Sequence, residues 1–195
     1  ALEPRLKLAL VHLLEGSPEE VPELLEPVRE AYPQNITLLS LLADSARQTS
    51  RENEALMLYR ELVRLAPANA EFRYRLARSY RAAGDAREYQ AKLLETLNLR
   101  PNLPTVRLEY AQTLFASGED TQVKQQLALL SEQGIANAEM KTLQGQLEQR
   151  SGNIDAAAEY FNAAFTEKPN NINLLRLSAA IWQTGDTARA ITLLE

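Results

Sequence analysis

The sequence predicts an all-α fold in which antiparallel helix pairs stack side by side as a solenoid. Three observations support this prediction: apolar residues recur at helical spacing, the pattern repeats every 34 residues, and each repeat carries a small residue at the same place. Glycine is scarce, and Ala, Leu, Glu, Gln and Arg dominate, which is a composition typical of helices. Prolines mark the repeat at one register, namely at Pro33, Pro67, Pro101 and Pro169.

The clearest unit lies at residues 70–101. Its first helix is predicted from apolar residues that share one face at three-to-four spacing: Phe72, Leu76, Ala77 and Tyr80. Gly84 can adopt the left-handed conformation that ends a helix, and Asp85 with Glu88 forms a capping box that starts the next one. The second helix turns a similar face inward, made of Tyr89, Leu93, Thr96 and Leu97. Neither helix can bury its face alone, so the pair needs neighbours.

Two further features recur in register with this unit. The interval without a proline holds a near copy, because APANAEF at 66–72 aligns with GIANAEM at 134–140. A glycine or serine ends every first helix: Gly16, Ser50, Gly84, Gly118, Gly152 and Gly185. Two helices approach closely where one presents little side chain, so the small residue in the eighth place of every unit predicts a recurring crossing. These residues are Ala9, Ala43, Ala77, Ala111, Gly145 and Ser178.

Other positions of the repeat carry equally regular residue types. They are clearest in two units, as Leu42, Ala43, Ala55, Tyr59 and Pro67, and as Gly145, Gly152, Ala157, Phe161, Ala164 and Pro169. This pattern resembles the tetratricopeptide (TPR) repeat family, whose unit is a 34-residue helix-turn-helix. The resemblance covers the whole chain and implies a right-handed superhelix of antiparallel helix pairs, an αα-superhelix.

The repeats divide the chain into one array over residues 1–195. It holds five full units and a truncated sixth: 2–35, 36–69, 70–103, 104–137, 138–170 and 171–195. The chain begins at Ala1 rather than Met, and it stops within a second helix that other units continue to their proline. We therefore expect a fragment of a longer protein.

The first unit departs from the regular pattern. Pro22 and Pro27 fall within its second helix, where each removes an amide donor, so this helix should be kinked or late-starting. A capping box is predicted at Ser17–Glu20. The unit is acidic, with three basic against seven acidic residues, whereas residues 70–107 carry eight basic against four acidic residues. Charge is therefore polarised along the array.

Later units also show departures. Pro104 opens the fourth unit at a first-turn position, where its missing donor does no harm. The fifth unit has Gln144 and Glu148 where leucine and an aromatic residue are usual. Apolar residues still recur at three-then-four spacing in this helix, but one residue away from the usual places of the repeat, at Met140, Leu143 and Leu147. This shifted seam predicts that the first helix of the unit is rotated. The turn before the sixth unit is one residue shorter than the others.

Catalysis finds little support in the sequence, and no cofactor is expected. The chain has no cysteine, and its one histidine, His12, occupies an aromatic slot of a helix, where a packing role is the simpler interpretation. Neither a metal site nor a nucleophile with its base can be assembled from these residues. We therefore predict that the chain is not an enzyme.

Binding is better supported, because stacked helix pairs form a curved ribbon whose inner face is lined by the first helices. By the resemblance, the second, fifth, ninth and twelfth places of each unit line this face; among others they hold Gln112, Thr142, Gln146, Leu175 and Ala179. We predict a groove that binds a protein or peptide with acidic and apolar side chains, the arginines pairing with carboxylates. Its predicted residues are Arg47, Tyr74, Arg78, Arg81, Leu108, Phe115 and Trp182.

A simpler role is open to the residues of this groove as well. The arginines can be solvated and pair with neighbouring glutamates, as charged residues on helix faces usually do. Trp182 can pack against a continuation of the chain. One known TPR function is rejected on sequence. The clamp for chaperone C-termini uses lysine and asparagine at the fifth and ninth places of one unit, asparagine in the next, and lysine and arginine in the third; these places here hold Leu6 and Leu10, Ser40 and Asp44, and Tyr74 and Arg78.

Three further interpretations concern the wider context. Nucleic acid is not expected as a ligand, because the chain has a net charge of −5 and its basic residues concentrate in about one unit. The array can instead recruit substrates for a catalytic domain outside this fragment.

In style, the chain is similar to bacterial TPR lipoproteins of exopolysaccharide and PEP-CTERM (exosortase) systems. That likeness implies a periplasmic or cell-envelope scaffold of a Gram-negative bacterium, with a possible lipid anchor outside the fragment; a cytoplasmic location is the alternative. No membrane-spanning run is visible.

Overall fold

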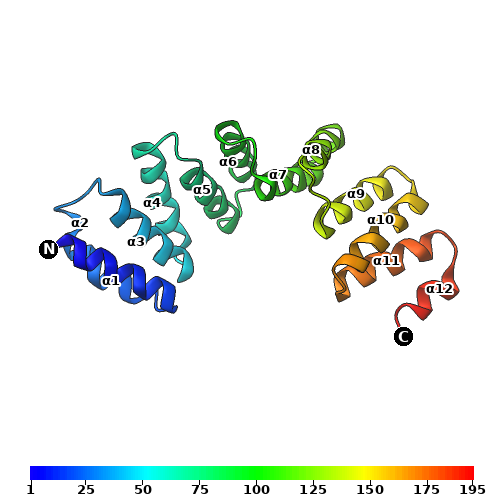
Figure 1. Cartoon of the computed structure of the whole chain (residues 1–195), viewed down its shortest axis with the longest axis horizontal. Helices are drawn as coiled ribbons and strands as arrows, with labels where there is room; N and C mark the ends of the chain where they lie inside the picture. The colour runs from blue at the N-terminus through cyan, green and yellow to red at the C-terminus, as the bar shows by residue number, and fades with distance from the viewer. The chain divides into compact units, whose positions relative to one another are not determined.

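The computed structural model describes residues 1–195 and contains twelve α-helices and no strand (Figure 1). The predicted all-α fold of helix pairs is confirmed. The helices are α1 (Leu2–Glu15), α2 (Glu20–Arg29), α3 (Ile36–Gln48), α4 (Glu52–Leu65), α5 (Ala70–Ala82), α6 (Ala86–Leu99), α7 (Pro104–Ala116), α8 (Asp120–Glu132), α9 (Ala138–Arg150), α10 (Ile154–Glu167), α11 (Asn171–Gln183) and α12 (Thr187–Thr192).

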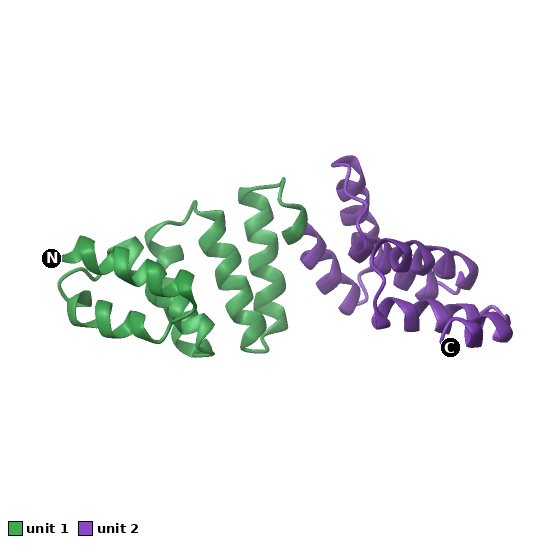
Figure 2. Ribbon diagram, turned by 60° about the horizontal axis from the view of Figure 1, so that its bottom comes forward, with its two compact units in different colours: residues 1–106 green, residues 107–195 purple.

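The chain divides into two compact units, unit 1 (Ala1–Val106) and unit 2 (Arg107–Glu195), coloured separately in Figure 2. In unit 1, α1 packs on α2, α3 on α4 and α5 on α6, and each pair also contacts the next. In unit 2, α9 packs on α10, α10 on α11, and α11 on α12. Each of these helices thus contacts its own partner or the adjacent pair, which is the packing of a solenoid.

The small residues of the repeat lie at these crossings. The four alanines among them, Ala9, Ala43, Ala77 and Ala111, have no exposed surface, and Ser178 is 4% exposed. At Gly145 the helices approach closely, since an added Cβ would lie 2.7 Å from Cε1 of Phe161. The fifth unit therefore brings α10 against the backbone of α9 at a point where no other residue fits without movement.

Helix ends follow the sequence at most positions. Gly84 has φ 77°, and Ser50, the one residue other than glycine at this place in the repeat, adopts the same left-handed region with φ 55°. Asp85 Oδ1 accepts a hydrogen bond from Glu88 N at 3.0 Å, which confirms one half of the predicted capping box; Asp85 N donates to Tyr80 O at 2.9 Å rather than to the Glu88 side chain. These local signals define where each helix stops and the next one begins.

The second helix of the first pair is shortened, as its prolines predict. Helix α2 has 10 residues, whereas α4, α6 and α10 have 14 each. The predicted capping box is wrong, because the N-cap is Glu19 and no side chain caps the helix. The turn before α2 is closed through the backbone instead, by Glu20 N donating to Ser17 O at 3.3 Å. Pro18 occupies this turn, and α2 starts after it.

The fifth first helix uses the shifted seam. Met140, Leu143 and Leu147 are 2–3% exposed, whereas Gln144 and Glu148 are half-buried. The apolar residues, rather than the usual places of the repeat, therefore set which side of α9 faces the core.

A polar network joins two neighbouring helix pairs in unit 1. The Tyr59 hydroxyl on α4 donates to Oδ1 of Asp44 on α3, and Arg75 on α5 donates to both oxygens of the same carboxylate. Arg75 Nε also donates to Glu71 Oε1 at 2.7 Å. Tyr59 has no exposed surface. We call three of these residues, Asp44, Tyr59 and Arg75, the inter-pair network.

The inter-pair network predicts how stability depends on pH. Burial first, and the negative charge of Asp44 second, raise the pKa of Tyr59 above its ordinary value of 10.0. The unfolded chain therefore loses this proton at a lower pH than the folded chain. Stability is intact below pH 10 and should fall above it by about 1.4 kcal/mol per pH unit. Urea unfolding between pH 8 and 11 should show this slope, and Tyr59→Phe should remove this residue's part of it.

Candidate functional site

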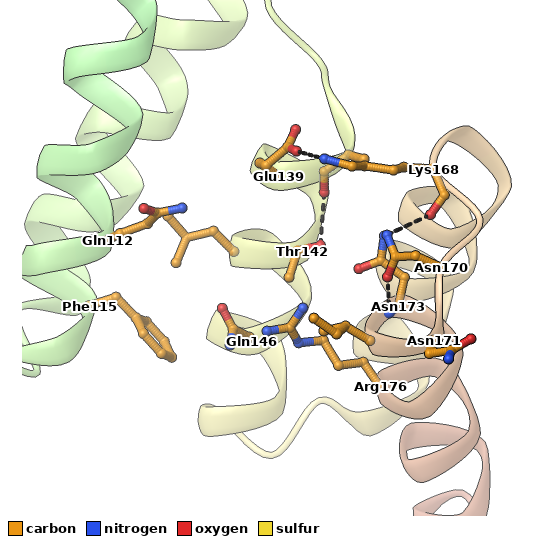
Figure 3. A pocket seen from close by; sticks show the side chains of 13 residues that line it. Gln112, Phe115, Glu139, Thr142, Gln146, Lys168, Asn170, Asn171, Asn173 and Arg176 are labelled. Atoms are coloured by element: carbon orange, nitrogen blue, oxygen red, sulfur yellow. Dashed lines mark hydrogen bonds and ion pairs between the residues drawn. The ribbon is translucent and has the colours of Figure 1, made fainter. Parts of the chain in front are cut away.

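Unit 2 contains a groove of about 870 Å³, which we call the amide groove. It is lined by α7, α9 and α11 and by the turn that precedes α11 (Figure 3). The first helices of three successive pairs thus face one hollow, as the resemblance implies. The lining residues are Gln112, Phe115, Ala138, Glu139, Thr142, Leu143, Gln146, Lys168, Asn170, Asn171, Ile172, Asn173 and Arg176.

Apolar surface in the amide groove comes mainly from two side chains. Phe115 is half-buried, and Ile172 is 62% exposed. Arg150 fixes Phe115, because its guanidinium lies 3.5 Å from the ring centroid and donates to Phe115 O at 2.9 Å. The same guanidinium donates to Asp120 Oδ1 at 2.7 Å. The ring is therefore held in place, and the groove also contains an exposed aliphatic side chain.

The turn before α11 is ordered by its own asparagines. Asn170 caps α11 by accepting a hydrogen bond from Asn173 N at 2.9 Å, and the Asn173 side chain donates to Lys168 O at 2.9 Å (Figure 3). Asn173 is only 6% exposed. These bonds give one wall of the groove a defined backbone conformation, because two side-chain amides close the turn internally.

Other amides in the groove have their hydrogen-bonding groups available. The side chains of Gln112, Gln146 and Asn171 form no hydrogen bond within the chain. Each amide offers both a donor and an acceptor, which is the combination that an extended peptide backbone requires. The groove thus combines apolar contact surface with polar groups able to pair with main-chain atoms.

The lining of the amide groove carries more positive than negative charge. Lys168 Nζ lies 2.6 Å from Glu139 Oε1 across the groove edge (Figure 3). The hydrogen bond from Lys168 lowers the pKa of Glu139, and that same bond raises the pKa of Lys168. Arg176 lines the same groove and forms no ion pair. One uncompensated positive charge therefore faces the hollow.

Unit 1 contains a smaller groove of about 470 Å³, lined by α1, α3 and α5. Leu6, Leu10 and Phe72 supply apolar surface. Its charged groups pair among themselves, since Lys7 lies 3.4 Å from Glu3, and Arg75 contacts Asp44 and Glu71. This groove offers no unpaired cation.

A third hollow of about 110 Å³ adjoins this smaller groove, because Glu71 and Arg75 line both. We call it the basic cavity; its lining residues are Arg47, Glu71, Tyr74, Arg75 and Arg78. The Arg78 guanidinium carbon lies 6.0 Å from the centre of the Tyr74 ring. Arg47 and Arg78 are exposed and form no ion pair.

The residues predicted from sequence for one groove are thus distributed over several places. Arg47, Tyr74 and Arg78 meet at the basic cavity of unit 1. Arg81 instead lies over the Tyr89 ring, with its guanidinium carbon 5.6 Å from the ring centroid. None of the three groove arginines, Arg47, Arg78 and Arg81, forms the ion pair with a glutamate that the alternative interpretation describes.

In unit 2 the predicted residues also separate. Phe115 lines the amide groove, as do Gln112, Thr142 and Gln146 from the implied lining places. Leu108 is only 9% exposed, so its side chain belongs to the core and offers little contact surface. Trp182 is 57% exposed, but it is not among the residues of the groove.

Several groove residues were missed by sequence reasoning. Arg176 and the asparagines of the turn were not predicted to line a site, whereas Ile172 occupies the second place of the sixth unit, which the resemblance implies as a lining place. The available signal was the three asparagines among residues 170–173, which coincide with the one turn that is a residue shorter than the rest.

Two other features, a metal-binding cluster and a membrane-spanning helix, are not found in the structure. No group of three or more His, Cys, Asp or Glu side chains is placed to hold a metal ion. None of the helices has the length and apolar character needed to cross a membrane.

Comparison with known proteins gives a consistent result for the fold. Residues 138–171 match the tetratricopeptide repeat family model. No curated protein matches the chain in sequence. Among solved structures, a tetratricopeptide repeat protein from Parabacteroides merdae superposes with a TM-score of 0.85 at 18% identity, over 98% of this chain and 77% of that chain.

Two other solved structures are similar over most of their length. YrrB, described as a TPR protein with an unusual peptide-binding site, has a TM-score of 0.77 at 17% identity, over 92% of this chain and 91% of that chain. PilF of Pseudomonas aeruginosa has a TM-score of 0.74 at 21% identity, over 89% of this chain and 79% of that chain. The chain therefore has the fold of tetratricopeptide repeat proteins, and its residues 138–171 carry that family's own repeat.

Proposed function

We propose that this chain is a non-enzymatic protein-interaction scaffold that holds an extended segment of a partner protein in the amide groove of unit 2. The observation that carries the proposal is the groove itself, an open hollow of about 870 Å³ built from the first helices of successive pairs. The groove combines two apolar side chains, the Phe115 ring that Arg150 holds in place and the exposed Ile172, with side-chain amides that form no hydrogen bond within the chain.

The groove chemistry suggests what the partner segment contains. An apolar side chain of the partner would cover Phe115 and Ile172, and this burial would stabilise the complex by about 25 cal/mol for each Å² of apolar surface removed from water. Gln112, Gln146 and Asn171 would pair with its main chain, and Arg176 would attract a carboxylate. The expected ligand is thus an extended peptide with apolar and acidic side chains. The comparison with YrrB supports a peptide ligand, because that protein is described as having a peptide-binding site.

A narrower proposal places the scaffold in the assembly of a bacterial cell envelope. It is supported by the similarity in fold to PilW, described as a type IV pilus biogenesis factor, with a TM-score of 0.76 at 16% identity over 98% of this chain and 90% of that chain. A role in exopolysaccharide assembly remains a prediction within this class. Recruitment of substrates for an enzyme is the alternative, and the same groove would serve it.

The test is peptide selection followed by substitution in the groove. Peptides selected from a random display library on the purified chain should be enriched in apolar and acidic residues. Phe115→Ala combined with Ile172→Ala should weaken their binding at least tenfold, since each truncation removes a contact of about 1 kcal/mol or more. Fluorescence anisotropy with labelled peptides measures this change.

A matched control uses two exposed aliphatic residues of unit 2 that lie outside the groove. Leu129 is 38% exposed and Ile191 is 50% exposed. Leu129→Ala with Ile191→Ala should leave the dissociation constants within twofold of the original. Selected peptides that bind the Phe115/Ile172 variant as tightly as the original chain would remove the amide groove as the binding site.

A further inference from the structure

The basic cavity of unit 1 has a charge that its surroundings do not balance. Three guanidinium groups line it, from Arg47 on α3 and from Arg75 and Arg78 on α5, and Glu71 is its only carboxylate. The lining alone carries a formal charge of +2, and Asp44, which pairs with Arg75 from outside the lining, reduces the local charge to +1. A hollow of this size, about 110 Å³, has room for a few water molecules or one compact anion.

The positive charge is concentrated on two of the three arginines. Arg75 is already engaged, because its guanidinium donates to Asp44 and to Glu71. Arg47 and Arg78 have no carboxylate within ion-pair distance, although arginines nearby in the same unit do. These two side chains come from successive first helices and face the same small volume.

The cavity is also partly ordered before any ligand arrives. Arg75 is fixed by the inter-pair network, and the Arg78 guanidinium lies beside the face of Tyr74. Guanidinium groups bind oxyanions through paired, charge-assisted hydrogen bonds, and a doubly charged anion gains more from two such groups than a singly charged one. Arg47 and Arg78, the two lining guanidinium groups that have no carboxylate partner, together match the two charges of a dianion.

We propose that the basic cavity binds one compact dianionic oxyanion, a phosphoryl group, through Arg47 and Arg78. The group would come from a phosphorylated side chain of a bound protein or from free phosphate, which share this chemistry. Arg75 forms one wall and keeps its pairing with Asp44. The site lies in unit 1, so it is separate from the amide groove of unit 2 and independent of it.

The test uses O-phosphoserine, inorganic phosphate and glutamate as probes, with binding followed by amide chemical shifts of the labelled chain. Phosphate and O-phosphoserine should shift the amides around Arg47 and Arg78, and glutamate should bind at least tenfold more weakly. Arg47→Gln with Arg78→Gln should weaken phosphate binding at least tenfold. Tighter binding of O-phosphoserine than of phosphate would assign the source to a modified side chain, and the reverse order to the free anion.

The control removes the same amount of charge elsewhere. Arg87 and Arg100 are exposed residues of unit 1 outside the cavity. Arg87→Gln with Arg100→Gln should keep binding within twofold, and circular dichroism should show the same helicity for both double variants. Equal losses in the two double variants would overturn the proposal, as would phosphate binding that survives Arg47→Gln with Arg78→Gln.

Two more measurements separate the basic cavity from the amide groove and from a nucleic-acid site. Phe115→Ala with Ile172→Ala should leave phosphate binding unchanged, so a failure of the amide groove and a failure of the basic cavity are distinguishable. A single-stranded oligonucleotide that bound more tightly than O-phosphoserine, with the same dependence on Arg47 and Arg78, would replace the proposal with nucleic-acid binding.

Discussion

Replacing Tyr59 with alanine is expected to lower the free energy of unfolding by about 4 kcal/mol. The side chain is fully buried, so the substitution leaves a cavity the size of an aromatic ring. It also removes the hydroxyl that donates to Asp44. Urea unfolding followed by circular dichroism in the far ultraviolet would measure the loss at neutral pH.

Two companion variants divide this effect into its parts. Tyr59→Phe keeps the ring and should cost about 1 to 2 kcal/mol, the usual effect of removing one hydrogen bond to a charged group. Tyr32→Ala serves as the control, because Tyr32 is 42% exposed and should cost under about 1 kcal/mol. A loss for Tyr59→Phe as large as that for Tyr59→Ala would contradict the dominant role given to packing.

Gly145→Leu is expected to destabilise unit 2 by about 3 kcal/mol, at the upper end for overpacked cores. A Cβ at this position would already lie 2.7 Å from Phe161 Cε1 and 2.8 Å from its Cδ1, and the ring is only 2% exposed. Helix propensity favours leucine over glycine by somewhat under about 1 kcal/mol, so the steric effect should dominate. The same unfolding experiment gives the change.

A second substitution tests whether the ring is the cause. Phe161→Ala should lower stability alone by creating a cavity, yet combined with Gly145→Leu it provides room for the new side chain. The double variant should therefore be more stable than the sum of the single losses predicts, by about 1 kcal/mol or more. Glu159→Leu, at an exposed position of α10, is the control for adding a leucine. Simple additivity would show that Gly145 is required for another reason.

Much of the fold could be predicted because the same sequence signals recur in every repeat. The small residues at the helix crossings and the residues with positive φ after the first helices are local signals, and both recur in every unit. Proline chemistry was equally direct at α2, whose shortening follows from Pro22 and Pro27. The predicted cap at Ser17 failed, since a proline directly after it changed the turn.

The site was less predictable, because a place in the repeat does not fix where a long side chain ends. Arg81 and Arg78 are three residues apart on α5, yet one lies over Tyr89 and the other beside Tyr74. Arg75 and Asp44 pair although they lie 31 positions apart, and no local sequence pattern indicates this pairing. Leu108 shows the same limit, since its burial depends on how α7 is rotated.

The inter-pair network has a consequence for how unit 1 opens. In a repeat array, stability is divided between the single repeats and the contacts between neighbours, and only the latter transmit local unfolding along the chain. Asp44, Tyr59 and Arg75 belong to three successive helices, so fraying of α3 and α4 would also release α5. Amide hydrogen exchange in these three helices should therefore occur as one cooperative event, although their sequences form two separate hairpins.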